Sequence, residues 1–232
     1  MSTRDLIYAA LAKSDAFRKG IHRLICGVEN LIYGGYKSPE VVALIKRVCK
    51  ESDMRITTAE AFALYAVAQA QREVPGAYAE VGVYRGGSTK LITEAKGDKP
   101  LHVFDTFAGL PTASAHDEGF FRQGMFAASL EQVQAYLADY PNIHFHPGWF
   151  PETAAPLEKQ QFAFAFLDVD LYESTRDGIA FFYPRLSPGG VLLTHDYQFP
   201  GVRRAFEEAG LAPRVLELAN AMAMVIKRPA GT

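Results

Sequence analysis

The spacing of hydrophobic positions changes near residue 76. Before it, apolar residues follow a helical period, as in the stretch over residues 40–50, where they are Val41, Val42, Leu44, Ile45 and Val48. An alanine-rich helix follows, with Thr58 as its expected N-cap and Pro75-Gly76 as its end. We therefore expect residues 1–75 to form a helical segment that caps the remainder of the chain.

After residue 76, short apolar runs alternate with helical patterns. The apolar runs predict strands over Tyr78–Val83, Leu101–Asp105, Ile143–His146, Phe162–Asp168 and Gly190–His195. The helical patterns between them cover Ser88–Ala95, Ser129–Asp139, Ser174–Tyr183 and Val202–Ala209. This alternation is typical of a parallel sheet with helices on both faces.

The last apolar runs do not continue that alternation. Arg214–Leu218 and Met222–Lys227 are separated by a short turn containing Asn220, which predicts a β-hairpin. A purely parallel nucleotide-binding sheet does not need a hairpin, whereas class I methyltransferases end their sheet with an antiparallel strand. We expect residues 76–232 to form one Rossmann-like α/β domain with a mostly parallel seven-stranded sheet and an antiparallel C-terminal strand.

Composition and charge exclude several classes of protein. The formal net charge is −2 without a Lys/Arg cluster, which argues against a nucleic-acid partner. The chain has no run of 18 apolar residues and no secretory signal pattern, so we expect a cytoplasmic protein without a membrane span. Cys26 and Cys49 do not form a C-x-x-C motif, and we expect reduced thiols rather than a zinc or redox site.

A glycine-rich loop follows the first predicted strand, with the pattern E-x-G-x-x-x-G-G from Glu80 through Gly82 to Gly86 and Gly87. Glycines at this position let a ligand lie against the bare main chain. A dinucleotide-binding protein would carry G-x-G-x-x-G instead. The preceding carboxylate suits a ligand with an amino-acid portion, such as adenosylmethionine. A helix-packing turn is the alternative interpretation.

Asp105 ends the second predicted strand, about 20 residues after the glycines, where an acid can bind ribose hydroxyls. Its alternative role is a solvated loop residue or an N-cap. Together with the glycine loop, Asp105 favours a nucleoside-containing cofactor. The long loop over Gly109–Met125 is typical of a lid or binding loop.

Four polar residues follow the fourth and fifth predicted strands: Asp168, Asp170, His195 and Asp196. Ligands of open α/β sheets bind beyond the carboxyl ends of strands, so we expect these side chains to meet there. Carboxylates at that edge suit Mg²⁺, which would lower the pKa of an acceptor hydroxyl. Alternatively His195 acts as a general base. A third interpretation is that the acids only cap the helices that follow.

Five segments, taken in order, resemble the macrocin O-methyltransferase family, whose members methylate sugar hydroxyls on macrolide and aminocoumarin antibiotics. The segments are EVGVYRGGST (80–89), FDTFAGLP (104–111), GWFPET (148–153), LDVDLYEST (167–175) and LSPGGVLLTHDY (186–197). The resemblance covers roughly residues 54–210. It implies a class I methyltransferase fold, adenosylmethionine as the methyl donor, and Mg²⁺ in the metal-dependent members.

The resemblance also implies roles for particular residues. The donor site would comprise Thr58, Glu80, Gly82, Tyr84, Gly86, Gly87, Ser88, Asp105, Thr106 and Asp168. The metal site would comprise Asp168, His195 and Asp196. Metal-dependent members carry paired acids where this chain has His195-Asp196, and histidine suits Zn, Ni or Fe better than Mg²⁺. The family's acid in the second segment is Ala108 here, so the acceptor side differs too.

These observations predict an adenosylmethionine-dependent O-methyltransferase that acts on a hydroxyl of a small molecule, such as a sugar or another natural product. Asp168 or His195 would take the proton, with or without Mg²⁺. Four aromatic residues are candidates for the pocket wall: Tyr84, Trp149, Tyr172 and Tyr197. The alternatives are an NAD(P)-dependent oxidoreductase and a non-catalytic adenosylmethionine-binding module. The apolar N-terminal helices suit either a homodimer surface or a cap over the site.

Overall fold

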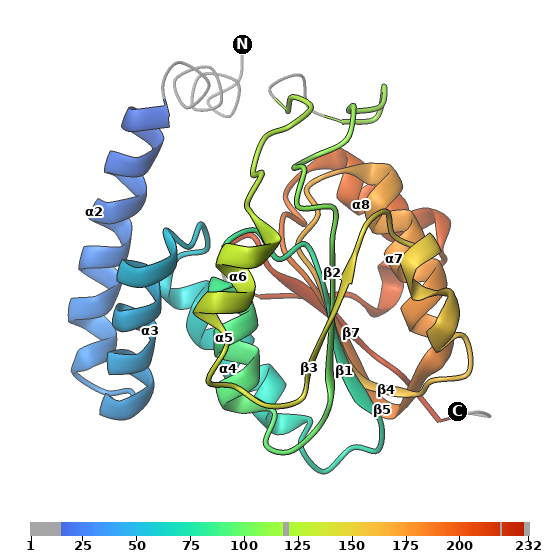
Figure 1. The fold of residues 1–232 in the computed structure, drawn as a ribbon, viewed down its shortest axis with the longest axis horizontal. Coiled ribbons are helices and arrows are strands. Elements are labelled where there is room, and N and C mark those ends of the chain that lie inside the picture. Colours follow the sequence, from blue (N-terminus) through green and yellow to red (C-terminus); the bar gives the residue numbers. More distant parts are fainter. Residues whose placement is uncertain (1–14, 118–120, 219, 230–232) are drawn as a thin grey trace.

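A seven-stranded sheet forms the centre of the computed structural model, which describes residues 15–117, 121–218 and 220–229 (Figure 1). The strands are β1 (Ala77–Val81), β2 (Leu101–Asp105), β3 (Ile143–Pro147), β4 (Phe162–Leu167), β5 (Leu186–Thr194), β6 (Leu216–Glu217) and β7 (Ala223–Ile226). Their order is β3-β2-β1-β4-β5-β7-β6. The first five strands pair in parallel, and β7 is antiparallel to both β5 and β6. The predicted fold class is confirmed.

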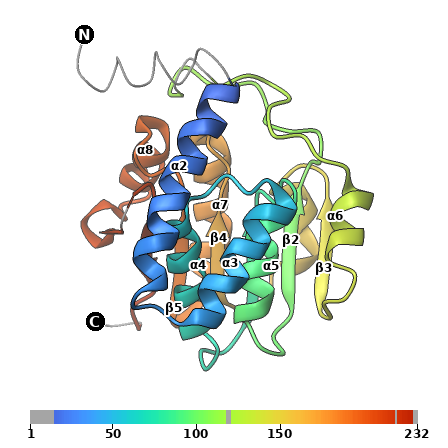
Figure 2. The same cartoon turned by 90° about the vertical axis from the view of Figure 1, so that its left-hand side faces the viewer.

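Helices cover both faces of this sheet. One face carries α4 (Thr58–Ala70), α5 (Gly87–Ala95) and α6 (Leu130–Tyr136), and the other carries α7 (Tyr172–Arg185) and α8 (Pro200–Glu208) (Figure 1). Two further helices, α2 (Asp15–Gly34) and α3 (Pro39–Ser52), pack outside α4 and α5 (Figure 2). Short 3₁₀ helices span Glu152–Leu157 and Ala212–Arg214. The expected helical structure of residues 1–14 lies outside the described residues.

The two faces bury separate hydrophobic clusters. Every residue of β4 is buried, and its side chains divide between the clusters, with Ala165 facing α7 and α8 and Phe166 facing α4 and α5. A strand buried on both faces reads as a continuous apolar run. This explains why the stretch from Phe162 onward shows no alternation of apolar and polar residues.

The start of α4 differs from the prediction. Thr57, not Thr58, is the N-cap: its hydroxyl accepts a hydrogen bond from Glu60 N (3.3 Å), and Glu60 Oε2 accepts one from Thr57 N (2.7 Å). This is a capping box, which needs Glu or Gln three residues after the cap. With Thr58 as the cap, that position would be Ala61. The helix also ends at Ala70, before the predicted Pro75-Gly76.

Other element ends shift by a few residues. β5 begins at Leu186, four residues before the predicted Gly190, because Leu186 pairs with Phe162 ahead of a register shift. β4 ends at Leu167, so Asp168 and Asp170 lie in the following loop, and Asp170 has a left-handed backbone (φ 59°). Asp168, predicted as the last residue of the strand Phe162–Asp168, therefore lies beyond the strand, although both acids line the same pocket.

The described residues include both cysteines and the helices in which a membrane span was not expected. Cys26 and Cys49 are both free, as expected. Among the helices described, none combines the length and apolar character needed to cross a bilayer. Helix α2 exposes several large apolar side chains, including Leu24 and Leu31.

Candidate functional site

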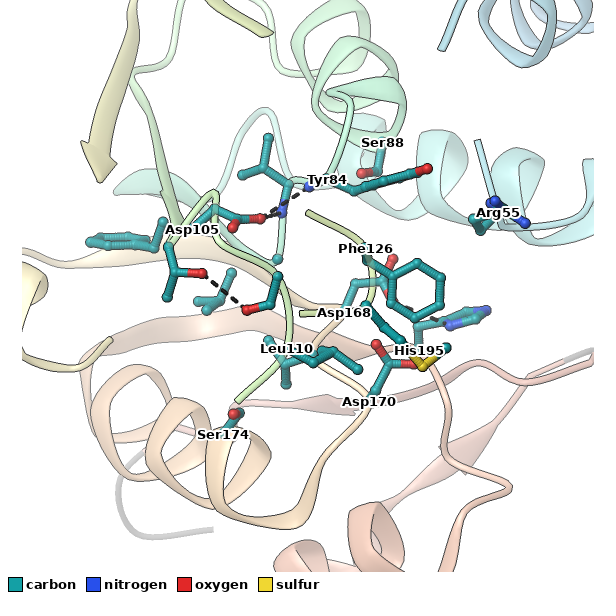
Figure 3. Close-up of a pocket in the computed structure, with 18 of the residues that line it drawn as sticks. Arg55, Tyr84, Ser88, Asp105, Leu110, Phe126, Asp168, Asp170, Ser174 and His195 are labelled. Atoms are coloured by element: carbon teal, nitrogen blue, oxygen red, sulfur yellow. Dashed lines mark hydrogen bonds and ion pairs between the residues drawn. The ribbon is translucent and has the colours of Figure 1, made fainter. Parts of the chain in front are cut away.

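A cavity of about 310 Å³ opens at the carboxyl ends of β1, β2, β4 and β5 (Figure 3). The strand order reverses between β1 and β4, and ligands of open α/β sheets bind at such a switch point. Residues of the predicted glycine loop and of the predicted acid cluster both line this cavity. From the glycine loop and β2, the lining residues include Gly82, Tyr84, Gly87, Ser88, Asp105 and Thr106.

Asp105 fastens the glycine loop to the end of β2. Its Oδ2 accepts hydrogen bonds from Val83 N (2.7 Å) and Tyr84 N (3.0 Å), and its Oδ1 accepts one from Phe107 N (2.7 Å). A carboxylate has about four acceptor positions, so one position is left for a ligand hydroxyl. Asp105 thus both shapes the loop and faces the cavity.

Gly82 brings the ends of β1 and β4 close together. A Cβ atom added to Gly82 would lie 1.9 Å from the carbonyl oxygen of Asp168, and its φ is +88°. Gly86 also has a positive φ (+79°), but it packs against α6 instead of lining the cavity. Of the predicted glycines, Gly82 and Gly87 lie on the cavity wall and Gly86 lies behind it.

Glu80 lies below the glycine loop, fully buried in β1 and behind the cavity wall. Its Oε2 accepts a hydrogen bond from the hydroxyl of Thr89 (2.5 Å), and its Oε1 has no hydrogen-bond partner among the described residues. Burial raises the pKa of Glu80 to about 8, against the nearby hydroxyls of Ser88 and Thr89, which lower it. A cationic ligand nearby would favour the charged form of Glu80. The role of Glu80 in donor binding stays a prediction.

Two other predicted donor residues differ in position. Thr106 lines the cavity, where its hydroxyl donates to Gly109 O (3.1 Å) and accepts from Ala108 N (3.1 Å). Thr58 is buried behind the wall and donates to Cys26 O (3.4 Å). The residues before α4 that reach the cavity are instead Ser52, Met54, Arg55 and Ile56.

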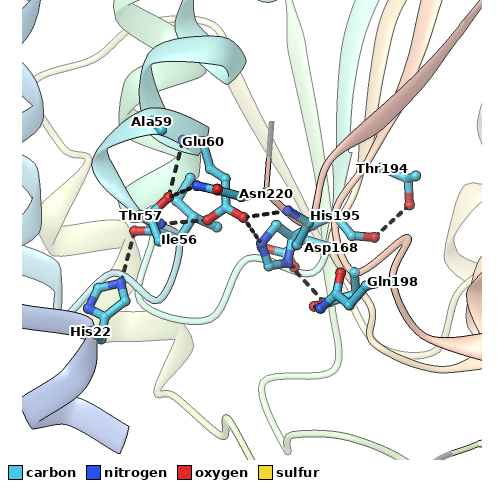
Figure 4. A network of polar contacts seen from close by, with 12 residues as sticks. His22, Ile56, Thr57, Ala59, Glu60, Asp168, Thr194, His195, Gln198 and Asn220 are labelled. Carbon is cyan, nitrogen blue, oxygen red and sulfur yellow. Dashed lines mark hydrogen bonds and ion pairs between the residues drawn. The ribbon is translucent and has the colours of Figure 1, made fainter. Parts of the chain in front are cut away.

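The acid cluster surrounds His195, whose side chain is 13 % exposed (Figure 4). Its Nδ1 lies 3.0 Å from Asp196 Oδ2 and 3.3 Å from Asp168 Oδ1. Its Nε2 lies 3.4 Å from Glu60 Oε1, on the first turn of α4. Asp168, Asp170, His195 and Asp196 all line the cavity, so the structure brings together the four residues expected there.

Burial and mutual charge shift the protonation of this cluster. Burial disfavours a charged imidazole, but the carboxylates of Asp196 and Asp168 outweigh it and raise the pKa of His195 well above its usual value. Burial also raises the pKa of Asp168, which the charge of His195 partly offsets. Burial and the charges of Asp196 and Asp168 raise the pKa of Asp170 further. The carboxylates around His195 therefore favour the protonated form of its ring.

The donor set fits Mg²⁺ poorly. Ligand atoms of Asp168, His195 and Asp196 lie within 4.8 Å of one another, close enough to share an ion. However, Mg²⁺ takes oxygen ligands, and a histidine binds metals only as the neutral imidazole. Here Nδ1 lies within ion-pair distance of two carboxylates, which favours a proton on that nitrogen. A nitrogen-accepting ion such as Zn²⁺ suits these residues better.

Aromatic and other apolar side chains form another part of the cavity lining. Tyr84 and Trp149 line it as expected, whereas Tyr172 donates to Glu208 (2.5 Å) and Tyr197 packs against Phe206, both away from the cavity. The apolar lining residues that the sequence did not predict include Phe121, Met125, Phe126 and Phe199. Three of them lie in or beside the loop expected to be a lid, and the length of that loop was the feature of the sequence that could have indicated them.

That loop is described over residues 109–117 and 121–125. Hydrogen bonds join its ends, from Leu110 N to Met125 O (2.8 Å) and from Gly124 N to Leu110 O (2.9 Å). Gly109, Leu110 and Pro111 line the cavity. The loop therefore forms part of the cavity wall, and its action as a lid stays a prediction.

Known proteins share both the sequence pattern and the fold. The chain is 36% identical over 151 residues to 8-demethyl-8-(2,3-dimethoxy-alpha-L-rhamnosyl)-tetracenomycin-C 4'-O-methyltransferase of Streptomyces olivaceus, covering 58% of each chain. It is 31% identical over 154 residues to demethyldecarbamoylnovobiocin O-methyltransferase of Streptomyces niveus, again covering 58% of each. These alignments thus span less than two thirds of the relatives.

A solved structure, that of the O-methyltransferase NovP, matches with a TM-score of 0.64 and 25% identity over 75% of this chain and 81% of that chain. The calicheamicin methyltransferase CalS11, with a TM-score of 0.62 and 20% identity over 85% of this chain and 95% of that one, shares the fold. The family model of macrocin O-methyltransferases matches residues 59–217, which include every strand up to β6 and the whole acid cluster. The chain belongs to the macrocin O-methyltransferase family.

Proposed function

We propose that this protein transfers a methyl group from adenosylmethionine to a hydroxyl of a small molecule, such as a sugar on a natural product. The observation that carries the proposal is one cavity lined by both the glycine loop and the acid cluster. The relatives named above are O-methyltransferases of glycosylated antibiotics, which supports an acceptor of this class. Trp149 also lines this cavity and is exposed, so its indole could stack on a ring of the acceptor.

The donor would lie along the glycine loop. Main-chain atoms at Gly82 and Gly87 allow close approach, and Asp105 has an acceptor position left for a ribose hydroxyl. Adenosylmethionine has no pyrophosphate, which agrees with a loop that lacks G-x-G-x-x-G. An NAD(P)-dependent oxidoreductase is therefore disfavoured.

The reaction needs a proton acceptor beside the methyl group. As the acceptor oxygen forms its bond to the methyl carbon, the carbon–sulfur bond breaks and the sulfonium becomes a neutral thioether. The hydroxyl proton goes to Asp168, because the carboxylates of Asp196 and Asp168 beside Nδ1 favour a protonated His195, which cannot accept a further proton. The raised pKa of Asp168 brings this carboxylate closer to neutrality, which suits a general base. Holding oxygen and methyl about 3 Å apart would supply much of the rate.

The proposal is tested with a panel of glycosylated and phenolic natural products and adenosylmethionine. We expect adenosylhomocysteine and an acceptor one methyl group heavier to form in equal amounts, measured by mass spectrometry. A protein that binds the donor but consumes none with any acceptor would favour the alternative of a non-catalytic binding module.

Removing divalent metal should leave turnover unchanged. The donor set around His195 suits Mg²⁺ poorly, so we expect the rate in excess EDTA to equal the rate with added Mg²⁺ within about twofold. The initial rate of adenosylhomocysteine formation is the measurement. Loss of activity in EDTA that Mg²⁺ restores would contradict this prediction, and restoration by Zn²⁺ alone would identify His195 as a ligand.

Asp105→Asn should weaken adenosylmethionine binding about tenfold or more. The amide is neutral and keeps one acceptor oxygen, so at least one of the N–H groups of Val83, Tyr84 and Phe107 loses its acceptor and the others lose a charged partner. Calorimetric titration gives the Kd. Asp98→Asn, at an exposed acid before the same strand, serves as the control and should leave the Kd unchanged.

Two proposals concern organisation. We propose that residues 1–75 cap a donor-binding domain of residues 76–232, and the presence of Met54, Arg55 and Ile56 on the cavity wall supports this division. The exposed apolar side chains of α2 are compatible with the homodimer expected above, which stays a prediction. Light scattering on the purified protein would measure its oligomeric state.

A further inference from the structure

Glu60 is a buried carboxylate outside the five motif segments quoted in the sequence analysis. It lies on the first turn of α4 with 3 % of its surface exposed, and it does not itself line the cavity. Buried carboxylates are costly unless each oxygen has a partner. The contacts of its two oxygens show what this residue does.

The two carboxylate oxygens of Glu60 contact different parts of the structure. Oε2 accepts from Thr57 N (2.7 Å) and completes the capping box of α4. Oε1 accepts from Ala221 N (3.0 Å), in the turn between β6 and β7, and lies 3.4 Å from His195 Nε2. A capping box needs only the first oxygen and accepts Gln as well as Glu. The second oxygen therefore connects α4 to the acid cluster.

Neighbouring contacts hold Glu60 in place (Figure 4). Asn220 Nδ2 donates to Thr57 Oγ1 (3.0 Å) and to Glu29 Oε1 (3.3 Å) on α2. Glu29 Oε2 in turn accepts from Ala59 N (2.9 Å). The carboxylate is thus fixed from the helix end and from the β6–β7 turn, so it offers His195 a rigid partner.

The orientation of the His195 ring follows from this partner. The two nitrogens of an imidazole point in different directions from the ring, so the contact of one sets where the other points. With Nε2 beside Glu60, Nδ1 points between Asp168 and Asp196. Without Glu60, the ring would lose the contact that fixes its rotation about the Cβ–Cγ bond.

We propose that Glu60 is a positioning residue that holds the ring of His195 so that its Nδ1 faces Asp168 and Asp196. Through this contact the helical segment before β1 takes part in the geometry of the proton-accepting cluster. The inference rests on the proposed function, because it takes Asp168, the ion-pair partner of His195, as the group that accepts the proton. It adds a residue on a helix that none of the recognised segments includes.

Glu60→Gln tests the proposal, since Gln retains the capping contact but not the second carboxylate oxygen. We expect kcat to fall about 10- to 100-fold, as a small misplacement of a reacting group does, with the Kd for adenosylmethionine changed less than about twofold. Glu60→Asp should lower kcat in the same direction, because its shorter side chain withdraws the charge from His195.

Thr57→Ala is the matched control. It removes the hydroxyl that accepts from Glu60 N and from Asn220 Nδ2, and should lower the Tm by about 2–4 °C. It keeps both main-chain donors to the Glu60 carboxylate, Thr57 N and Ala221 N, and so leaves Oε1 beside His195. We expect its kcat to stay within about twofold of the wild type. A similar loss of kcat in Thr57→Ala and Glu60→Gln would show that only helix stability matters and would overturn the proposal.

A double-mutant cycle with His195→Gln gives the second test. If Glu60 acts through His195, adding Glu60→Gln to His195→Gln lowers kcat no further, whereas independent roles would multiply the two losses. Nitrogen-15 NMR of the histidine rings gives a readout without any acceptor: the His195 resonances should move in Glu60→Gln and Glu60→Asp but not in Thr57→Ala. Unmoved resonances overturn the proposal. Moved resonances in a protein without methyl transfer would instead show that the proposed function has failed.

Discussion

Asp168→Asn should lower kcat by about 10²- to 10⁴-fold, the usual contribution of a general base. Asp168 lies on the cavity wall, 3.3 Å from His195 Nδ1, and is the carboxylate best placed to take the proton of an acceptor hydroxyl. The amide of Asn keeps the size of the side chain but cannot accept a proton. Donor binding should change little, since the loop contacts of Asp105 are untouched.

The role of Asp168 as a base also predicts how kcat changes with pH. The base acts only when ionised, so the wild-type rate should rise with pH through the pKa of Asp168, which burial raises above its ordinary range. Asp168→Asn should lose this rise along with the rate. Asp139→Asn, at an exposed acid far along the chain, is the control and should keep both. A wild-type rate in Asp168→Asn would place the base elsewhere.

Gly82→Ala should cost about 2–5 kcal/mol of unfolding free energy and abolish most donor affinity. The new Cβ would lie 1.9 Å from the carbonyl oxygen of Asp168, which is backbone and cannot rotate away. The ends of β1 and β4 must then separate, which displaces the glycine loop and the loop that carries the base. Urea unfolding and calorimetric titration of adenosylmethionine measure the two effects.

Gly189→Ala separates the steric effect from backbone strain. Gly189 has nearly the same φ (+82° against +88°), but a Cβ there would meet nothing within 4 Å. We expect Gly189→Ala to cost about 1 kcal/mol and to leave donor binding intact. Equal losses in both variants would mean that the close approach of β1 and β4 is unimportant.

Periodicity predicted most of the fold because it records burial directly. The fully buried β4 and the parallel β1 and β2 appear as short apolar runs, and the hairpin around Asn220 is marked by its turn. The misplaced cap of α4 has a local cause. Thr57 and Thr58 are both acceptable caps, and only the Glu three residues after Thr57 distinguishes them. Likewise, the early start of β5 depends on pairing with Phe162, which no local pattern records.

The site was predictable where residues follow strands. Asp105 is the last residue of β2, and Gly82, Asp168 and His195 each come directly after a parallel strand; such positions converge at one edge of a sheet. Glu60 was not predictable in its second role, because the contact with His195 joins residues that are far apart in the sequence. The aromatic wall from Phe121 and Phe126 also depends on the path of a loop, which has no period.

The most direct test of the central claim is a calorimetric titration of adenosylmethionine into the purified protein, with NADH and NADPH titrated in parallel. The glycine loop, Asp105 and the acid cluster predict that adenosylmethionine binds at one site per chain with a Kd on the order of micromolar, about −8 kcal/mol, and that neither nicotinamide cofactor binds. Binding of a nicotinamide cofactor without any binding of adenosylmethionine would contradict the assignment of this cavity to methyl transfer.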